Sequence, residues 1–384
     1  MRIALAVGLC LLSLLPFAAV ETGAANAKDS AKNRPSPTSV RESYRTRLNN
    51  NMVTIMAGSA QATDLTIVQD IAAALDDGEA LRVVPMVGQG PAQSLKDVMF
   101  MRGVDMGITH TNVLKHFART GEVGPGIESQ VTYVAKLFNE EMHVVARAET
   151  SDLGALEGKT VNIGVAGSGA EITARLVFEA LSITVREVHL NEADALAKLK
   201  TGGIDATVVV AGKPTPILSQ LDRGDGLKFL GVPYIKGLEA DYYPAVLDNS
   251  DYPALVEDGA RVDTISVCAV LVSFNWKTDS TRYRKIDRFV DRFFSNFDAF
   301  QVAPRHPKWR QVNFAATLEG WKRSPASQAW IDRAKSVAAA DPSTQARFDT
   351  FLAEADTGPA SASPEEQAKL FRAFVEWSKT QDQN

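Results

Sequence analysis

The sequence predicts a two-lobe α/β protein, with a hinge formed by two strands that cross between the lobes. Strand-helix units alternate in two separate blocks, over residues 52–120 and again over 159–232. Such alternation is typical of largely parallel sheets, because a helix carries the chain back between successive strands. The apolar runs at 142–145 and 264–274 lie after each block and are predicted to be the crossings. A chain of 384 residues is long enough for two separate cores.

The N-terminus has the pattern of a cleaved secretory signal peptide. Arg2 precedes the almost entirely apolar residues 3–20, and Ala25-Asn26-Ala27 offers a small-x-small cleavage site. A transmembrane anchor is the alternative, but the run is barely long enough and contains Pro16. Cleavage would leave Cys268 as the sole cysteine, so the exported chain would contain no internal disulfide. The expected location is the periplasm.

Elements of the first lobe follow a polar segment that is interpreted as a linker, with order expected to begin near Val53. The helix expected over 64–78 has Ile67, Ile71 and Leu75 at helical spacing and Gly78 as a stop. The other elements expected here are strands at 52–58, 80–88 and 104–110, a helix ending at 103, and a helix starting at 111.

The second lobe repeats this order. A strand at 159–167 leads into a helix at 168–181 whose Ile172, Leu176, Val177 and Leu181 share one face. Further elements expected here are strands at 185–190, 204–212 and 227–232 and a helix at 192–203.

The chain becomes helical from about residue 280, where Ile286, Phe289, Val290 and Phe293 have helical spacing. These patterns together predict six segments. They are a signal peptide (1–27), a linker (28–49), the first segment of lobe I (50–146), lobe II (147–262), the return segment of lobe I (263–334) and a helical C-terminal extension (335–384).

Several function classes are disfavoured by composition and motifs. The net charge of −5, without a basic run, argues against a nucleic-acid-binding protein. GxSxG, phosphate-loop, HExxH and CxxC motifs are absent from the sequence, and Gly88-Gln89-Gly90 has Gln93 where a dinucleotide fingerprint requires a third glycine. The five histidines have no recognised metal-ligand spacing. The sequence therefore predicts no catalytic group, no metal and no cofactor.

Polar loops follow four of the predicted strands. Because the carboxyl ends of parallel strands meet at a crevice where ligands bind, these loops are expected to converge on an interlobe cleft. The candidate ligand-binding residues, in chain order, are Gly58, Ser59, Gln61, His110, Asn112, Gly167, Ser168, Gly169, Glu171, Lys213 and Thr215.

Each loop also has a structural interpretation. A glycine-rich helix start at 167–169 suits an anion, yet Ser168 and Glu171 match a capping box that would satisfy the helix start internally. Asp64 after the first loop is interpreted as a helix cap. His110 is either a proton-dependent ligand contact or a structural histidine, and Lys213 either pairs with ligand charge or faces solvent in a proline turn.

Three segments carry a family resemblance: "VNIGVAGSGAEITAR", "LNEADALAKLKTGGIDATVVVAGKPTPIL" and "DMGITHTNV". They resemble TAXI-type solute-binding receptors of TRAP transporters, over roughly residues 52–300, and "MHVVAR" is similar to that family's crossing strand. The resemblance implies a type II periplasmic-binding fold that closes on its ligand by hinge motion. It also implies a small organic anion, such as glutamate or another carboxylate, and TRAP-type membrane subunits as partners.

Some positions depart from that family's pattern. The first loop lacks tyrosines, His110 and Asn112 stand where the family usually has glutamine and aspartate, and Lys213 replaces an apolar residue. These differences suggest an altered ligand. A receptor that serves a signalling partner, an enzyme on a related two-lobe fold and a structural envelope protein remain the alternatives.

Overall fold

A computed structural model describes residues 37–60 and 62–339 of the chain. The expected signal peptide, most of the expected C-terminal extension and Gln61 lie outside the described residues. None of the helices in the described part of the chain combines the length and apolar character that a bilayer span requires.

Helix α2 (Pro37–Asn51) occupies the second half of the segment expected to be a linker. Pro37 starts the helix, where its missing N–H costs nothing, and no glycine or further proline interrupts the 14 residues that follow. Glu42 and Arg45 form an exposed ion pair of 2.7 Å one turn apart. Order therefore begins well before Val53, which corrects the expectation from sequence. The polar composition was a poor guide because a solvent-exposed helix is also polar.

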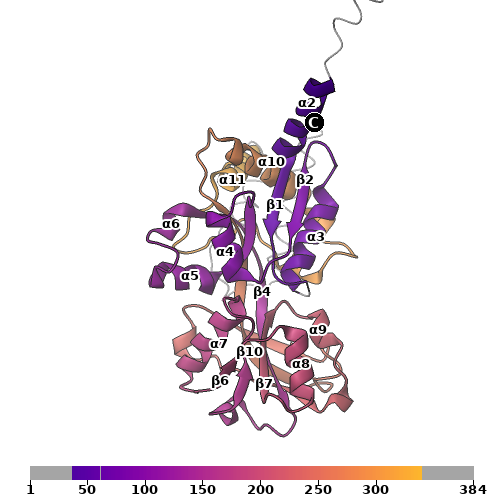
Figure 1. The fold of residues 1–384 in the computed structure, drawn as a ribbon, viewed down its shortest axis with the longest axis vertical. Helices are drawn as coiled ribbons and strands as arrows, with labels where there is room; N and C mark the ends of the chain where they lie inside the picture. Colours follow the sequence, from indigo (N-terminus) through magenta and orange to yellow (C-terminus); the bar gives the residue numbers. More distant parts are fainter. Residues whose placement is uncertain (1–36, 61, 340–384) are drawn as a thin grey trace, which may run out of the picture. The chain divides into compact units, whose positions relative to one another are not determined.

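Lobe I begins with the predicted alternation of strands and helices (Figure 1). Strands β2, β1 and β3 pair in parallel in that order, with Val53 opposite Val83 and Ile55 opposite Met106. The elements are β1 (Met52–Met56), α3 (Thr63–Leu75), β2 (Arg82–Met86), α4 (Pro91–Phe100), β3 (Met106–His110), α5 (Thr111–Thr120) and α6 (Ile127–Gln130).

Lobe II repeats the pattern with β7, β5 and β6 in parallel. Its elements are η1 (Leu153–Leu156), β5 (Thr160–Asn162), α7 (Gly169–Ala180), β6 (Arg186–Val188), α8 (Glu192–Lys200), β7 (Ala206–Ala211), α9 (Pro216–Ser219), η2 (Arg223–Asp225), β8 (Leu227–Leu230), η3 (Lys236–Leu238) and β9 (Tyr243–Asp248). Strand β9 was not predicted, because Pro244 interrupts its short run and it pairs only with β10.

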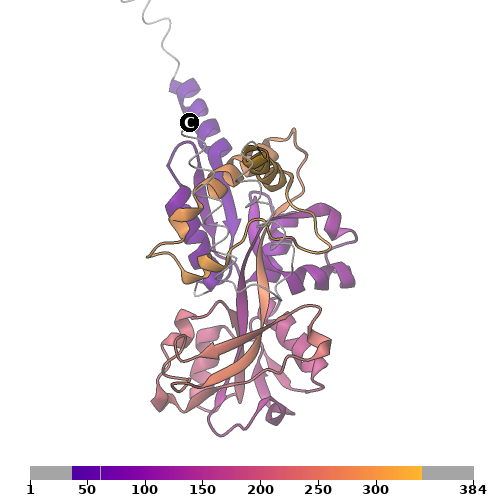
Figure 2. The same ribbon diagram turned by 180° about the vertical axis from the view of Figure 1, so that it is seen from behind.

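Two long strands, β4 (Val131–Arg147) and β10 (Arg261–Phe274), cross between the lobes (Figures 1 and 2). They pair with each other in an antiparallel manner, β10 pairs with β3 of lobe I, and β4 pairs with β7 of lobe II. The result is one 10-stranded sheet whose main path is β2-β1-β3-β10-β4-β7-β5-β6. This confirms the two-lobe type II architecture with a hinge of two strands. Parallel pairing is restricted to the outer strands of each lobe.

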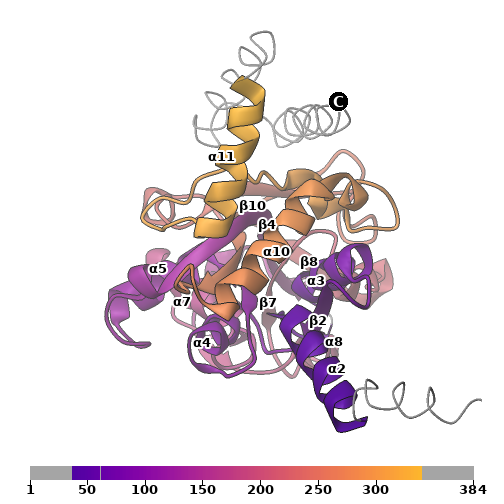
Figure 3. The ribbon, with the colours of Figure 1, turned by 90° about the horizontal axis from the view of Figure 1, so that it is seen from above.

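After β10 the chain returns to lobe I, as expected, and adds α10 (Thr281–Ser295), η4 (Phe297–Phe300), η5 (Pro307–Gln311) and α11 (Pro325–Ala339). Helices α10 and α11 pack together on this lobe (Figures 2 and 3). Their core is aromatic: the Phe294 and Phe314 rings stack 4.0 Å apart, and Trp330 meets Phe294 edge-on. This packing also fixes η5, which carries Lys308 toward the hinge.

Candidate ligand site between the lobes

The predicted loops meet where the two lobes touch. The Thr63 hydroxyl of lobe I donates a hydrogen bond of 3.2 Å to the Gly212 carbonyl of lobe II. The Asn112 amide donates to the Thr173 and Tyr242 hydroxyls, at 2.9 and 3.0 Å. A Cβ atom built on Gly169 would lie only 3.0 Å from His110 Nδ1, so lobe I leaves very little room for a side chain there. The lobes are therefore closed against each other in this structure.

In the first loop, Gly58 is buried and Ser59 is half-buried. The Gly58 carbonyl accepts a hydrogen bond of 3.1 Å from the Gly88 N–H, which ties the loop to lobe I. Asp64 does not cap helix α3, since the capping position is Ala62 and no side chain bonds to the helix start. The interpretation of Asp64 as a cap is therefore wrong, and its buried carboxyl needs another explanation.

At the start of α7, the structural interpretation accounts for most contacts. The Ser168 hydroxyl accepts a hydrogen bond of 3.1 Å from the Glu171 N–H. The Glu171 carboxylate accepts one from the Gly167 N–H rather than from Ser168, so the capping box is shifted by one residue. Arg175 holds the same carboxylate at 2.8 Å. Glu171 is thus an internal anion that already uses the Gly167 N–H.

Lys213 and Thr215 make their contacts within lobe II and with the hinge. Lys213 Nζ donates to the Asp251 carboxylate at 2.7 Å and to the Val246 carbonyl at 2.8 Å. The Thr215 N–H donates to the Tyr252 hydroxyl at 2.9 Å. The charge of Lys213 is therefore paired with Asp251 in the closed structure.

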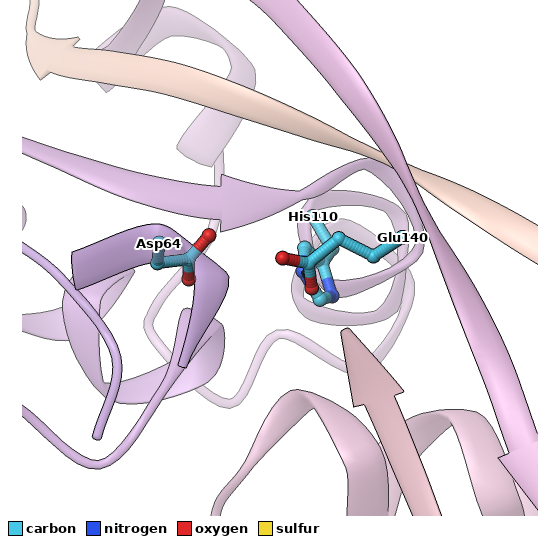
Figure 4. Close-up of side chains that lie close together, drawn as sticks. All are labelled: Asp64, His110 and Glu140. Atoms are coloured by element: carbon cyan, nitrogen blue, oxygen red, sulfur yellow. Dashed lines mark hydrogen bonds and ion pairs between the residues drawn. The ribbon is translucent and has the colours of Figure 1, made fainter. Parts of the chain in front are cut away.

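Asp64, His110 and Glu140 form a buried cluster (Figure 4). Asp64 lies in the first turn of α3, His110 ends β3, and Glu140 lies on the crossing strand β4. Their exposed fractions are only 2%, 1% and 3%. His110 Nε2 lies 2.8 Å from Glu140 Oε2, and one ligand atom from each residue lies within 4.8 Å of the others.

Burial controls the protonation of this cluster. Loss of hydration disfavours the charged form of each group. It raises the pKa of Glu140 to about 8 and lowers the pKa of His110 to about 4. The pKa of Asp64 is also raised by burial, with a further contribution from Glu140. Near neutral pH, Glu140 is therefore mostly a neutral carboxylic acid and His110 a neutral imidazole, and burial also favours the protonated form of Asp64.

The neighbouring residue on β4 behaves differently. Glu141 Oε1 accepts a hydrogen bond of 2.6 Å from Lys308 Nζ, and both side chains are buried. Glu141 Oε2 also accepts one of 2.9 Å from the Lys213 N–H. This buried ion pair links η5 of lobe I to the hinge and to the start of the 213–215 loop.

A group of buried polar atoms within the described residues has no hydrogen-bond partner. Among the described residues, His110 Nδ1, Thr111 Oγ1 and Asn112 Oδ1 are buried and have no hydrogen-bond partner, and neither has Asp64 Oδ1. An unsatisfied buried polar atom costs about 1–3 kcal/mol, so such atoms are usually satisfied by water or a ligand. Three consecutive residues, from the end of β3 into α5, therefore carry buried polar atoms that no described residue satisfies.

A family model described as NMT1-like matches residues 55–307, about two thirds of the chain. The chain belongs to the NMT1-like family. Three solved structures share low sequence identity with it. MatC from Rhodopseudomonas palustris with bound malate is 14% identical over 86% of this chain and 98% of its own, with a TM-score of 0.45.

The periplasmic binding protein BugD is 11% identical over 79% of this NMT1-like chain and 97% of its own, with a TM-score of 0.45. The alkanesulfonate-binding protein SsuA from Xanthomonas axonopodis pv. citri bound to MOPS is 13% identical over 86% of this chain and 84% of its own, with a TM-score of 0.41. Likeness at this level says nothing about the ligand of the NMT1-like protein.

Between the lobes, the NMT1-like protein has a groove of about 460 Å³ that is lined by α4 and α5 of lobe I and by α7 of lobe II. Its charged side chains are mixed: Lys96 pairs with Glu122 at 2.6 Å, and Arg175 pairs with Glu171. Because Gly167 and Glu171 also line it, the groove leads to the start of α7.

Sequence reasoning missed four residues of this site in the NMT1-like protein: Asp64 as a cluster member, Thr111, Glu140 and Lys308. One pattern could have revealed Glu140, because "NEE" at 139–141 interrupts an otherwise apolar crossing strand. Charged residues are rarely fully buried unless they are paired, so two glutamates in such a strand indicate buried partners. Lys308 has no comparable pattern, since only the return of η5 brings it to the hinge.

Proposed function

We propose that this protein is an exported receptor that captures a small organic anion, a carboxylate or an amino acid such as glutamate, between its two lobes. One observation carries the proposal: buried polar atoms of His110, Thr111 and Asn112 have no partner among the described residues, and this segment contacts lobe II. A polar solute bound at this position would satisfy them. Membership of the NMT1-like family and the hinge of two crossing strands are consistent with this role.

Recognition of the anionic group would involve the start of α7. The first N–H groups of a helix lack intrahelical acceptors and carry partial positive charge. Gly169 presents its backbone directly against His110 and leaves no side chain between them. When the lobes separate, a carboxylate could reach these N–H groups, with Thr111 and Asn112 contacting the rest of the solute. Lys213 and Ser168 would support the loops.

The receptor would deliver its solute to TRAP-type membrane subunits from the periplasm, after removal of residues 1–27. This part of the proposal rests on the TAXI-type resemblance. A receptor that serves a sensor protein is the second candidate, motivated by the altered first loop. Cross-linking in cells, with recovery of TRAP-type subunits rather than a sensor, would distinguish the two. We propose no enzymatic activity.

Solute capture can be tested with the mature chain purified from the periplasm. A thermal-shift screen of carboxylates and amino acids should yield a hit, because a ligand at 100 times its Kd adds about 2.7 kcal/mol. Asn112→Ala should abolish that hit, since it removes a side chain between the lobes. Asn275→Ala is the matched control, because the side chain of this half-buried asparagine donates to the Ser129 carbonyl within lobe I. A folded protein with no hit across the panel would contradict the proposal.

A further inference from the structure

We propose that Asp64, His110 and Glu140 form a binding site for one divalent transition-metal cation, for which Zn²⁺ is the most suitable probe. The three side chains come from distant parts of the sequence and converge at the floor of the interlobe region (Figure 4). The inference does not depend on solute capture, because the cation would bind these side chains directly.

The donor set fits this class of cation. One imidazole nitrogen and two carboxylate oxygens are common ligands of Zn²⁺, which binds them at about 2.0–2.2 Å. The ligand atoms of the cluster lie within 4.8 Å of one another, so modest side-chain movements would bring all three onto one ion. A harder cation such as Mg²⁺ or Ca²⁺ prefers an all-oxygen shell and is less suited to a histidine.

A second observation points to a missing ligand. Asp64 Oδ1 and His110 Nδ1 are buried in the cluster, and neither has a partner among the described residues. In Figure 4 the Asp64 carboxyl faces the Glu140 carboxyl across the cluster. Lys308, whose charge acts on Glu140, is hydrogen-bonded to Glu141 instead. A bound cation would satisfy acidic oxygens that this part of the structure leaves without a positive partner.

The histidine–carboxylate group around His189 lacks these properties. His189 lies 3.9 Å from Glu171 and 4.0 Å from Glu187, but its side chain is about one-third exposed. Both of those carboxylates are already paired with Arg175. His189 therefore provides a matched control for adventitious binding at a surface histidine.

The fold also allows the ion to enter. Asp64 and His110 belong to lobe I and Glu140 to the crossing strand, whereas Gly169 of lobe II covers His110. Separation of the lobes would uncover the cluster without dividing it. Because three protein ligands leave at least one coordination position, water or a solute could complete the shell.

The test uses the mature chain after treatment with a chelator. Titration with ZnCl₂, followed by calorimetry and by competition with a chromophoric chelator, should give one ion per chain. Metal binding requires deprotonated carboxylates, so the heat should depend on the ionisation enthalpy of the buffer. Glu140→Gln and Asp64→Asn should each weaken binding by more than about 100-fold, since even outer-shell changes cost 10–100-fold. His189→Gln should bind like the parent protein.

Three results would overturn the proposal. They are no stoichiometric Zn²⁺ binding by the parent protein, Zn²⁺ binding by Glu140→Gln and Asp64→Asn that is as tight as that of the parent, or loss of Zn²⁺ binding in His189→Gln. Cooperative melting of Glu140→Gln and Asp64→Asn checks that the variants fold, and either variant alone decides the question. The solute screen is repeated with chelator present. A solute hit without Zn²⁺ binding contradicts only the proposed metal site. Zn²⁺ binding without a solute hit contradicts only the proposed receptor function.

Discussion

Glu140 and Glu141 are adjacent on one strand, yet their carboxyls have opposite surroundings. Glu141 is paired with Lys308 at 2.6 Å, whereas Glu140 faces a carboxyl and an imidazole. Burial raises the pKa of Glu140 to about 8, because desolvation outweighs the attraction of Lys308. The two faces of strand β4 therefore have different roles. Glu141 connects η5 to the hinge, whereas Glu140 contacts His110, whose Nδ1 has no partner among the described residues.

The largest expected effect comes from Glu141→Gln compared with Glu140→Gln. The first change leaves Lys308 buried without its partner and should lower the free energy of unfolding by about 3–5 kcal/mol. The second replaces a carboxyl that is already mostly neutral at pH 7, so it should cost less than about 1 kcal/mol. Urea denaturation of the metal-stripped proteins measures both. Equal losses would show that the two carboxyls are in the same state.

Lys308→Met tests the same ion pair by removing the lysine instead of Glu141. It leaves the buried Glu141 uncompensated and should also cost about 3 kcal/mol or more. Lys96→Met is the control, since the exposed Lys96–Glu122 pair is worth at most about 1 kcal/mol. If the Glu141→Gln, Lys308→Met double variant is no more stable than the sum of the single losses predicts, the two residues are not coupled.

Much of the architecture was predictable, since it depends on local patterns. The helical spacing of Ile286, Phe289, Val290 and Phe293 correctly placed α10, and all four are buried. The alternation of strands and helices correctly predicted the two lobes. The exposed helix α2 and the edge strand β9 lack a strong apolar pattern, so neither was found.

The site was less predictable because it depends on contacts between distant segments. The polar loops were placed at the lobe interface, but nothing near Lys213 in the sequence indicates that Asp251 holds its charge. Likewise, the Ser168–Glu171 pattern predicted a cap, while the actual acceptor for the Gly167 N–H could be identified only from the structure.

Asn112→Ala tests whether the hydrogen bonds between the lobes, near His110 in the sequence, keep the lobes closed. Removing two hydrogen bonds between the lobes should favour the open form by about 1–3 kcal/mol. Small-angle scattering should then report a larger radius of gyration for the ligand-free variant than for the parent. An unchanged radius would mean that these bonds do not hold the lobes together.

His306, which contacts Lys308, predicts a pH dependence of the stability. Its Nδ1 accepts a hydrogen bond from the Lys308 N–H, and burial, with Lys308, lowers its pKa to about 4. Asp70 acts in the opposite direction. Because the unfolded chain binds this proton first, His306 contributes stability above pH 6.5 that is lost as the pH falls toward 4.

In His306→Asn, the decline in stability between pH 6.5 and 4 should be shallower by at most about 1.4 kcal/mol per pH unit. Urea unfolding at several pH values measures the slope. A variant with the same acid slope as the parent would contradict the assignment.

Lys213→Ala should have the smallest effect. Its ion pair with Asp251 is partly exposed, so its loss should cost about 1 kcal/mol or less. Solute affinity should change little, because the Lys213 ammonium is directed to Asp251 and the Val246 carbonyl. A tenfold or larger loss of affinity would restore Lys213 as a direct contact of the solute.

The path of the chain through β4 and β10 also sets an order of events during synthesis. Lobe II is one continuous stretch between the two crossing strands, so its residues emerge together from the ribosome. Lobe I, by contrast, needs β10 between β3 and β4, and its aromatic core is completed by Trp309, Phe314 and Trp330. The first segment of lobe I therefore cannot complete its fold until β10 and the aromatic residues that follow it have been synthesised. Until then its apolar strands are exposed and prone to aggregation.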